Sequence, residues 1–330
     1  MSFIAVVMAL LIEQARPMAP GNRLHALMRA WAGWSTRNFD AGQAAHAWLA
    51  WSLAVGVPSV LVLAVYWSLD AWLGWPAALV WSVAVLYATL GFRQFSSHFT
   101  QIREALANSD ETLARDLLAN WRQIDVRDLP RSEVLRSVMA HSVIAAHRHV
   151  FGVLAFFSLL AVFGLGPAGA VLYRASEFLA RFWRDESQTR FQPVSQQTQD
   201  AAGLAWDLLD WVPARITAVS FAVVGSFEDA MEAWRRHLSE PDQGNDALIL
   251  AATSGAVNIR LTSVGPGRAQ PDAAEDSASA GLPSEDQVAA SGAGQTPELA
   301  HLAVIVGLVW RTVVMWVVLL ALLTLARLLG

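Results

Sequence analysis

HAWLAWSLAVGVPSVLVLAVYWSL, from His46 to Leu69, is followed after Asp70 by AWLGWPAALVWSVAVLYATLGF, from Ala71 to Phe92. Each stretch is long enough for one helix to cross a bilayer, because about 20 apolar residues span roughly 30 Å of hydrocarbon. The short connector predicts that the two helices run antiparallel as a hairpin. Tryptophans stand near the ends of both stretches, where their rings favour the boundary between lipid and water. The sequence therefore predicts an integral membrane protein.

The composition of the 330-residue chain agrees with a lipid environment. Hydrophobic residues make up 55% of it and charged residues only 15%, and the mean hydropathy is +0.37. Soluble domains usually carry about 25% charged residues. The net charge of −5 argues against a nucleic-acid partner, which would require a basic surface. All 23 Lys or Arg residues are arginine, and the chain contains no cysteine. The lack of lysine excludes a pyridoxal-phosphate Schiff base, and the lack of cysteine excludes a cysteine nucleophile and a zinc–thiolate site.

Further apolar stretches predict an all-α fold, a polytopic membrane bundle of antiparallel helix hairpins. Residues 143–165 and 168–183 form a second hairpin around a Gly-Leu-Gly-Pro turn, and residues 301–329 form a last span. Residues 3–12 and 201–227 are also apolar, but the first stretch is short and the second contains charges. We therefore expect five spans, with these two stretches as weaker candidates.

Two polar segments are predicted to lie outside the hydrocarbon. Residues 93–142 contain seven arginines, which places them in the cytoplasm by the positive-inside rule. Their apolar residues recur at helical spacing and predict amphipathic helices at the membrane surface: Ile102, Leu106, Leu113, Leu117 and Leu118. Residues 262–299 lack aromatic residues and are rich in Ala, Ser, Gly, Pro and acids, which predicts a disordered acidic linker. The expected organisation is a membrane domain at 1–261, this linker, and a C-terminal transmembrane helix at 300–330.

Charged side chains inside the apolar stretches predict a polar pocket within the membrane. An ionisable group at the bilayer centre costs about 3 kcal/mol on insertion scales, so such groups persist when they pair or face a cavity. Asp207 and Asp210 are three residues apart and share a helix face, and Arg215 can reach back if the intervening proline kinks the helix. Arg174 and Glu177 stand in the neighbouring apolar stretch. The alternative is a structural role, in which ion pairs only lock the helices together.

Three ionisable residues, His147, Arg148 and His149, interrupt another apolar stretch near its start. They lie near its predicted cytoplasmic boundary, where side chains that reach toward the interface account for them. A functional role is the alternative. Residues i and i+2 of a helix face opposite ways, so His147 and His149 are not expected to form a metal pair.

Three motifs resemble the CobD/CbiB superfamily. The most recognisable is an acidic helix that runs into Trp-x-Pro-x-Arg, here DLLDWVPARIT at 207–217. The others are YRA at 173–175 and Asn245 followed by SGAVNIRL at 254–261. The resemblance runs from about residue 1 to 261 and includes the last span. It adds Asn245 and Arg260 to the candidate residues of the pocket.

The superfamily has two branches, and the residues of this chain favour the second. The first branch contains adenosylcobinamide-phosphate synthases, which join adenosylcobyric acid to an aminopropanol or its phosphate late in cobalamin biosynthesis. The second is AmpE, an inner-membrane protein tied to β-lactamase induction that has no established reaction. Synthase motifs carry acids where this chain has EQAR at 13–16 and AHRHVFG at 146–152, and their Asn before the Trp is Asp210 here, while Asp207 is retained. A condensation helped by ATP needs carboxylates to hold Mg²⁺, so the loss of these acids argues against catalysis.

The resemblance therefore implies an AmpE-like accessory or sensor protein of the bacterial inner membrane, with several spans and with no cofactor or metal. Whether the chain is an enzyme stays open. The alternative is the synthase itself, with Mg²⁺ and ATP as cofactors, Asp207 as the metal- or phosphate-binding acid, and Arg215 and Arg260 contacting an anionic substrate. Expected partners are the lipid bilayer and either another envelope protein or a corrinoid. A transporter is a third and weaker alternative, because no repeated half is visible.

Overall fold

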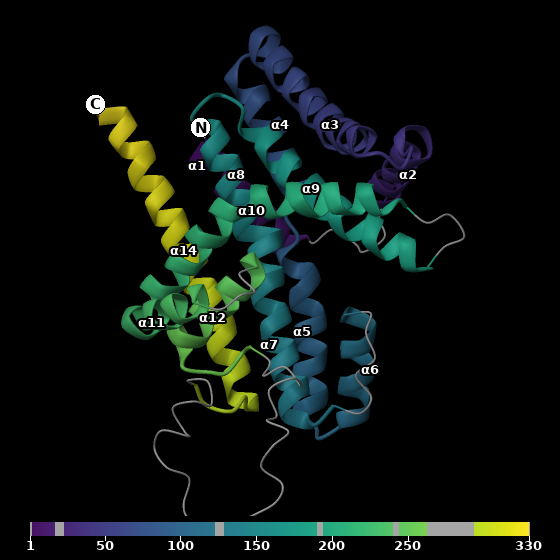
Figure 1. Ribbon diagram of the computed structural model, residues 1–330. Helices are drawn as coiled ribbons and strands as arrows, with labels where there is room; N and C mark the ends of the chain where they lie inside the picture. Colours follow the sequence, from purple (N-terminus) through teal and green to yellow (C-terminus); the bar gives the residue numbers. More distant parts are fainter. Residues whose placement is uncertain are drawn as a thin grey trace, which may run out of the picture. The chain divides into compact units, whose positions relative to one another are not determined.

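The computed structural model describes residues 2–16, 23–122, 129–189, 194–239, 244–262 and 294–329. This part of the chain is almost entirely helical and contains no β-strand. The helices in chain order (Figure 1) are α1 (Ser2–Ala15), α2 (Arg23–Phe39), α3 (Ala44–Leu73), α4 (Trp75–Thr89), α5 (Phe92–Ala107), α6 (Glu111–Arg122), α7 (Arg131–Ala146), the π-helical turn η1 (His147–Phe151), α8 (Gly152–Ala161), α9 (Gly166–Thr189), α10 (Gln196–Val224), α11 (Phe227–Leu238), α12 (Asn245–Val257) and α14 (Leu299–Leu329). The predicted all-α class is confirmed.

The chain divides into two compact units. The first unit contains Met1–Ser97, Ala145–Thr217 and Val313–Gly330. The second contains His98–Ile144 and Ala218–Thr312. Both units are therefore assembled from segments that are distant in the sequence.

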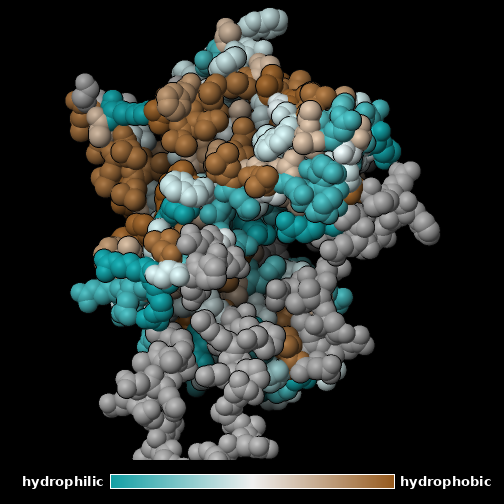
Figure 2. Space-filling view, in the orientation of Figure 1, coloured by the Kyte–Doolittle hydropathy of each residue, from teal (hydrophilic) through white to brown (hydrophobic). Residues whose placement is uncertain are grey.

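The helices α3 and α4 form the predicted hairpin in the first unit (Figure 1). They meet at Gly74, whose φ of +81° lies in the left-handed region that glycine adopts without strain. Trp81 of α4 donates its indole N–H to the carbonyl oxygen of Val62 in α3 at 3.0 Å, which holds the two helices side by side. Large apolar side chains of the hairpin point outward, and Trp72 and Val80 are 86% and 69% exposed. Figure 2 shows hydrophobic side chains gathered over the region where Figure 1 places this hairpin, as expected of a surface in contact with lipid.

Among the residues that the structure describes, three helical segments are long and apolar enough to cross a membrane by their length and composition. They are Ala44–Leu73, Arg131–Ala161 and Leu299–Arg327, and two shorter apolar helices are Ser2–Ala15 and Trp75–Thr89. The first and third of the long segments coincide with predicted spans. The short helix α1 contains the weaker candidate at 3–12.

Three of the other predicted spans differ from the structure. The span predicted at 71–92 begins inside α3, and its own helix α4 has 15 residues and is one of the shorter apolar helices. The span predicted at 143–165 belongs to a continuous helical segment that begins at Arg131, so the end of the predicted surface segment 93–142 is part of it. Sequence averages place this beginning in water because it is polar, whereas tertiary packing buries its Val138 and Met139. Residues 168–183 lie in α9, which is helical but is not among the described helices apolar enough to span, because charged residues interrupt it.

The helices α5 and α6 bury part of the predicted apolar stripe. Ile102, Leu106 and Leu118 are buried, whereas Leu113 is 46% exposed. Packing inside the protein therefore covers most of these apolar side chains. A membrane surface is not needed to explain their helical spacing.

The second unit contains a close helical pair, α11 and α12 (Figure 1). A Cβ atom at Gly255 would lie 2.3 Å from the carbonyl oxygen of Asp229, so the two backbones nearly touch. The N–H of Ser226 donates to the carbonyl oxygen of Ala256 at 2.9 Å, and Ala230 is buried at the same crossing. Small residues permit this approach.

Most of the predicted linker, 263–293, lies outside the described residues. The chain on its two sides is joined, because Ile259 and Gln295 form an isolated parallel bridge. The N–H of Arg260 donates to Gln295 and the N–H of Gln295 donates to Asn258, both at 3.0 Å. The helix α14 then begins at Leu299, at the predicted position of the C-terminal helix.

Asp40 connects the junction of α2 and α3 to the start of α10. Its carboxylate accepts hydrogen bonds from the backbone N–H of Ser195 at 2.8 Å and from the hydroxyl of Ser195 at 2.5 Å. The N–H of Gly42 donates to it at 3.2 Å. Partial burial raises the pKa of Asp40, but these hydrogen bonds outweigh burial and hold the pKa below its usual value of 3.8.

Asp40 should therefore contribute to stability in a pH-dependent way. Because its folded pKa lies below its unfolded pKa, the contribution is present above pH 3.8 and is lost as the pH falls through the folded value. We expect Asp40→Asn to lower the melting temperature in detergent at neutral pH, and the difference from the wild type to shrink below pH 3.8. Asp70→Asn, at an exposed aspartate of α3, is the control. A difference that stays constant with pH would contradict this account.

Candidate functional site

Four polar side chains meet inside the first unit and are called here the polar cluster: His147, Tyr173, Asp210 and Thr217. They come from η1, α9 and α10, and each is 0% exposed. A buried polar group is tolerated when it is hydrogen-bonded, so the contacts within this cluster decide its stability.

Asp210 is the acceptor at the centre of the polar cluster. Its Oδ1 atom lies 2.8 Å from Nε2 of His147 and accepts the hydroxyl proton of Tyr173 at 2.7 Å. The Nδ1 atom of His147 lies 2.9 Å from the hydroxyl oxygen of Thr217. When Nε2–H donates to the carboxylate, Nδ1 accepts the hydroxyl proton of Thr217, so a neutral imidazole satisfies both contacts.

The second carboxylate oxygen of Asp210 is the exception in this network. The atom Oδ2 is buried and has no hydrogen-bond partner among the described residues. A buried acceptor without a donor costs about 1–3 kcal/mol, and more when it is charged. The polar cluster therefore keeps one unused acceptor, which a water molecule or an N–H group of a ligand can fill.

Gly152, directly after the π-helical turn, makes room for Tyr173. A Cβ atom at Gly152 would lie 2.0 Å from the hydroxyl oxygen of Tyr173. The tyrosine ring is held from other sides by Phe156 and Trp206, whose ring centroids lie 5.4 Å and 5.1 Å away. The missing side chain at Gly152 thus allows Tyr173 to reach Asp210. Single π-helical turns are frequent at functional sites.

A second charged group lies on α9. Arg174, Glu177 and Arg181 occupy positions i, i+3 and i+7, so they share one face of the helix. The side chain of Glu177 is 1% exposed and forms ion pairs with both arginines, through Oε2 to Arg174 and through Oε1 to Nε of Arg181 at 2.5 Å. The side chains of Arg174 and Arg181 are 13% and 45% exposed. One buried carboxylate is thus shared by two guanidinium groups.

The structure brings together only part of the pocket predicted from the sequence. Asp210 belongs to the polar cluster, and Arg174 and Glu177 pair on α9. Asp207 is exposed on α10 and is not part of the polar cluster. Residues three apart on a helix diverge by about 60°, and the edge of the buried face runs between Asp207 and Asp210.

The other predicted residues lie elsewhere. The guanidinium of Arg215 stands 3.9 Å from the ring centroid of Trp211 and donates to the carbonyl oxygen of the same residue at 3.0 Å. Asn245 begins α12 and Arg260 follows that helix, and both belong to the second unit.

His147, Tyr173 and Thr217 were not among the site residues predicted from the sequence. The prediction that the side chain of His147 reaches toward the interface is wrong, because this side chain is fully buried. A histidine inside an apolar stretch needs a buried hydrogen-bond partner. The position of His147 in the sequence could therefore have indicated a buried polar contact. Its partner Asp210 is 63 residues away in the sequence, so only the tertiary structure identifies it.

The described residues contain no group of three or more His, Asp or Glu side chains that could hold a metal ion. The polar cluster offers one carboxylate and one imidazole, and Asp207 stands exposed apart from it. These described residues do not form the Mg²⁺ site that the synthase resemblance implies.

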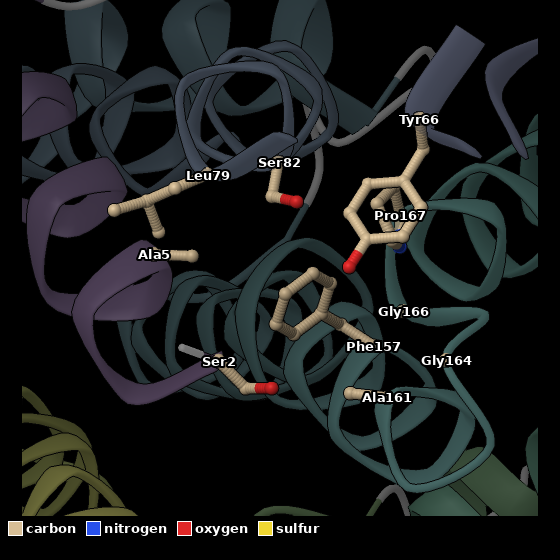
Figure 3. A pocket seen from close by; sticks show the side chains of 10 residues that line it. All are labelled: Ser2, Ala5, Tyr66, Leu79, Ser82, Phe157, Ala161, Gly164, Gly166 and Pro167. Carbon is tan, nitrogen blue, oxygen red and sulfur yellow. The ribbon is translucent and has the colours of Figure 1, made fainter. Parts of the chain in front are cut away.

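A small cavity of about 40 Å³, partly open to solvent, lies elsewhere in the first unit. Figure 3 shows the hydroxyl of Tyr66 and the ring of Phe157 pointing into it. Its other polar side chains are the hydroxyls of Ser2 and Ser82, and no charged residue lines it. The cavity therefore offers hydrogen bonding but little acid–base chemistry.

The apolar helices and the buried polar cluster are those of a helical membrane protein with a polar site inside an apolar core. Residues 3–279 match the sequence profile of the CobD/CbiB protein family. The chain belongs to this family, as the motifs on α9 and α10 indicated.

Curated relatives carry one name. The chain is 29% identical over 335 residues to the cobalamin biosynthesis protein CobD of Stutzerimonas stutzeri, and the match covers 96% of each chain. Proteins of the same name from Chromobacterium violaceum (29% over 181 residues, 54% of each chain) and Leptospira interrogans (27% over 199 residues, 58% of this chain and 59% of the relative) are also similar. No solved structure matches the chain. These relatives support the cobalamin branch of the resemblance and not the AmpE branch that the missing acids favoured.

Proposed function

We propose that this chain acts in cobalamin biosynthesis and joins adenosylcobyric acid to an aminopropanol or its phosphate through an amide bond, with ATP as the co-substrate whose phosphoryl group carries away the carboxylate oxygen as phosphate. The observation that carries the proposal is the similarity over 96% of both chains to a cobalamin biosynthesis protein. The pathway comes from the name of that relative. The reaction comes from the superfamily branch that the motifs DLLDWVPARIT and YRA resemble.

We also propose that the chain crosses the bacterial inner membrane several times. The three long apolar helices and the two shorter ones support this placement. The arginines of segment 93–142 that precede the long helical segment Arg131–Ala161 support a cytoplasmic position for α5 and α6. The polar substrate and product of the proposed reaction would then be handled on the cytoplasmic side.

The two faces of α10 suggest separate roles within the proposed function. Asp207, Trp211 and Arg215 are spaced four residues apart and form a row on one face, where Asp207 is exposed and Trp211 is 51% exposed. The carboxylate, the indole ring and the guanidinium group of this row can contact a substrate. His147 is fully buried and both of its ring nitrogens have partners, so we assign it a positioning role that holds α10 and fixes the exposed row.

Genetic complementation tests the proposal. We expect the chain, expressed in a bacterial strain that lacks its own synthase, to restore growth that depends on cobalamin made by the cell. The relative from Stutzerimonas stutzeri serves as the positive control, with equal amounts of both proteins in the membrane fraction. If the relative restores growth and this chain does not, the proposed reaction is wrong.

A further inference from the structure

The charges around Glu177 do not balance. Among the residues that the structure describes, Arg174 and Arg181 both form their ion pairs with this one carboxylate. Two guanidinium groups therefore share a single negative charge. Since the side chains of Glu177 and Arg174 are 1% and 13% exposed, water screens the charges of this pair only weakly.

Neighbouring elements bring further basic side chains close to these contacts. His149 of η1 lies within electrostatic range of Glu177 and of both arginines of α9, and its Nδ1 atom is buried without a hydrogen-bond partner among the described residues. Arg174 also lies close enough to His25 of α2 for their charges to interact. Arg148 also interacts electrostatically with Glu177. The positive charges of Arg174 and Arg181 alone already exceed the single negative charge of Glu177.

We propose that this basic group, defined as Arg174, Arg181, His149 and the shared Glu177, binds a phosphate group. A guanidinium presents its N–H donors as a planar fork that matches phosphate oxygens, and such charge-assisted hydrogen bonds are strong. Arg181 is 45% exposed, so a ligand can reach it while Glu177 keeps both arginines in place. The phosphate belongs either to a free phosphate compound or to the headgroup of a lipid. The inference does not depend on the proposed reaction, because binding can be measured without turnover.

Thermal unfolding of the full-length protein in lipid-free detergent tests this site. In one arm inorganic phosphate is titrated against chloride at constant ionic strength, and in the other phosphatidylglycerol is added. A ligand that binds only the folded state raises the melting temperature in a saturable way. The variants are Arg181→Gln and Arg181→Lys, and Arg235→Gln is the matched control, because it makes the same charge change at an exposed arginine of α11.

We expect saturable stabilisation of the wild type and of Arg235→Gln in at least one arm. Arg181→Gln should weaken the apparent affinity about tenfold or more, and Arg181→Lys by less. A response to phosphate identifies a free phosphate compound as the occupant, and a response to phosphatidylglycerol alone identifies a lipid headgroup. Absence of saturable stabilisation in both arms would overturn the inference, as would an Arg181→Gln variant that responds like the wild type. A failed complementation test would leave this result unaffected.

Discussion

Gly152→Ala is expected to lower the free energy of unfolding by about 3 kcal/mol, from overpacking of a buried site and loss of a buried hydrogen bond. The added Cβ atom would lie 2.0 Å from the hydroxyl oxygen of Tyr173. The tyrosine cannot move away easily, because it is 0% exposed and packs against Phe156 and Trp206. Its displacement would break the 2.7 Å hydrogen bond to Asp210. Thermal and denaturant unfolding in detergent measure this loss.

Gly56→Ala is the control for this substitution. Gly56 lies inside α3, and a Cβ atom there would meet nothing within 4 Å. Alanine favours a helix over glycine by about 0.5–1 kcal/mol, so this variant should be as stable as the wild type or more so. Equal stabilities of Gly152→Ala and Gly56→Ala would show that Tyr173 does not occupy the space beside Gly152.

Asp210→Ala is expected to destabilise the protein by about 3–5 kcal/mol, because it leaves buried partners of a polar network without their acceptor. Both Nε2 of His147 and the hydroxyl of Tyr173 lose the oxygen atom that they contact. Asp207→Ala provides a control on the same helix, since Asp207 is exposed and its removal should change stability by less than about 0.5 kcal/mol. Denaturant unfolding of both variants gives the comparison.

A double-mutant cycle locates the origin of that loss. If His147 and Asp210 stabilise each other, the effects of His147→Ala and Asp210→Ala should be non-additive by about 0.5–3 kcal/mol. Additive effects would mean that the 2.8 Å contact between the two side chains has no energetic consequence. A large loss in Asp207→Ala would likewise contradict the assignment of separate buried and exposed faces to α10.

The sequence predicts the parts of the fold that depend on local composition. The α3–α4 hairpin follows from two long apolar stretches with tryptophans at their ends, and α14 follows from a third. The prediction fails where packing overrides composition. The start of the segment Arg131–Ala161 is polar in sequence, yet its apolar side chains, such as Val138 and Met139, are buried.

The candidate site is only partly predictable for a similar reason. The cost of a buried charge correctly draws attention to Asp210, Arg174 and Glu177. Helical spacing alone cannot decide that Asp210 is buried while Asp207 is exposed. It also cannot pair Asp210 with His147, because the two residues meet only when η1 and α10 pack together.

The most direct test of the proposed function is product formation by the purified protein in lipid nanodiscs. Adenosylcobyric acid, aminopropanol phosphate, ATP and Mg²⁺ are supplied, and corrinoids are identified by mass spectrometry. The account predicts a corrinoid that carries the aminopropanol phosphate through a new amide bond. If the relative from Stutzerimonas stutzeri yields this product under the same conditions while the present chain leaves adenosylcobyric acid unchanged, the chain does not catalyse the reaction proposed for it.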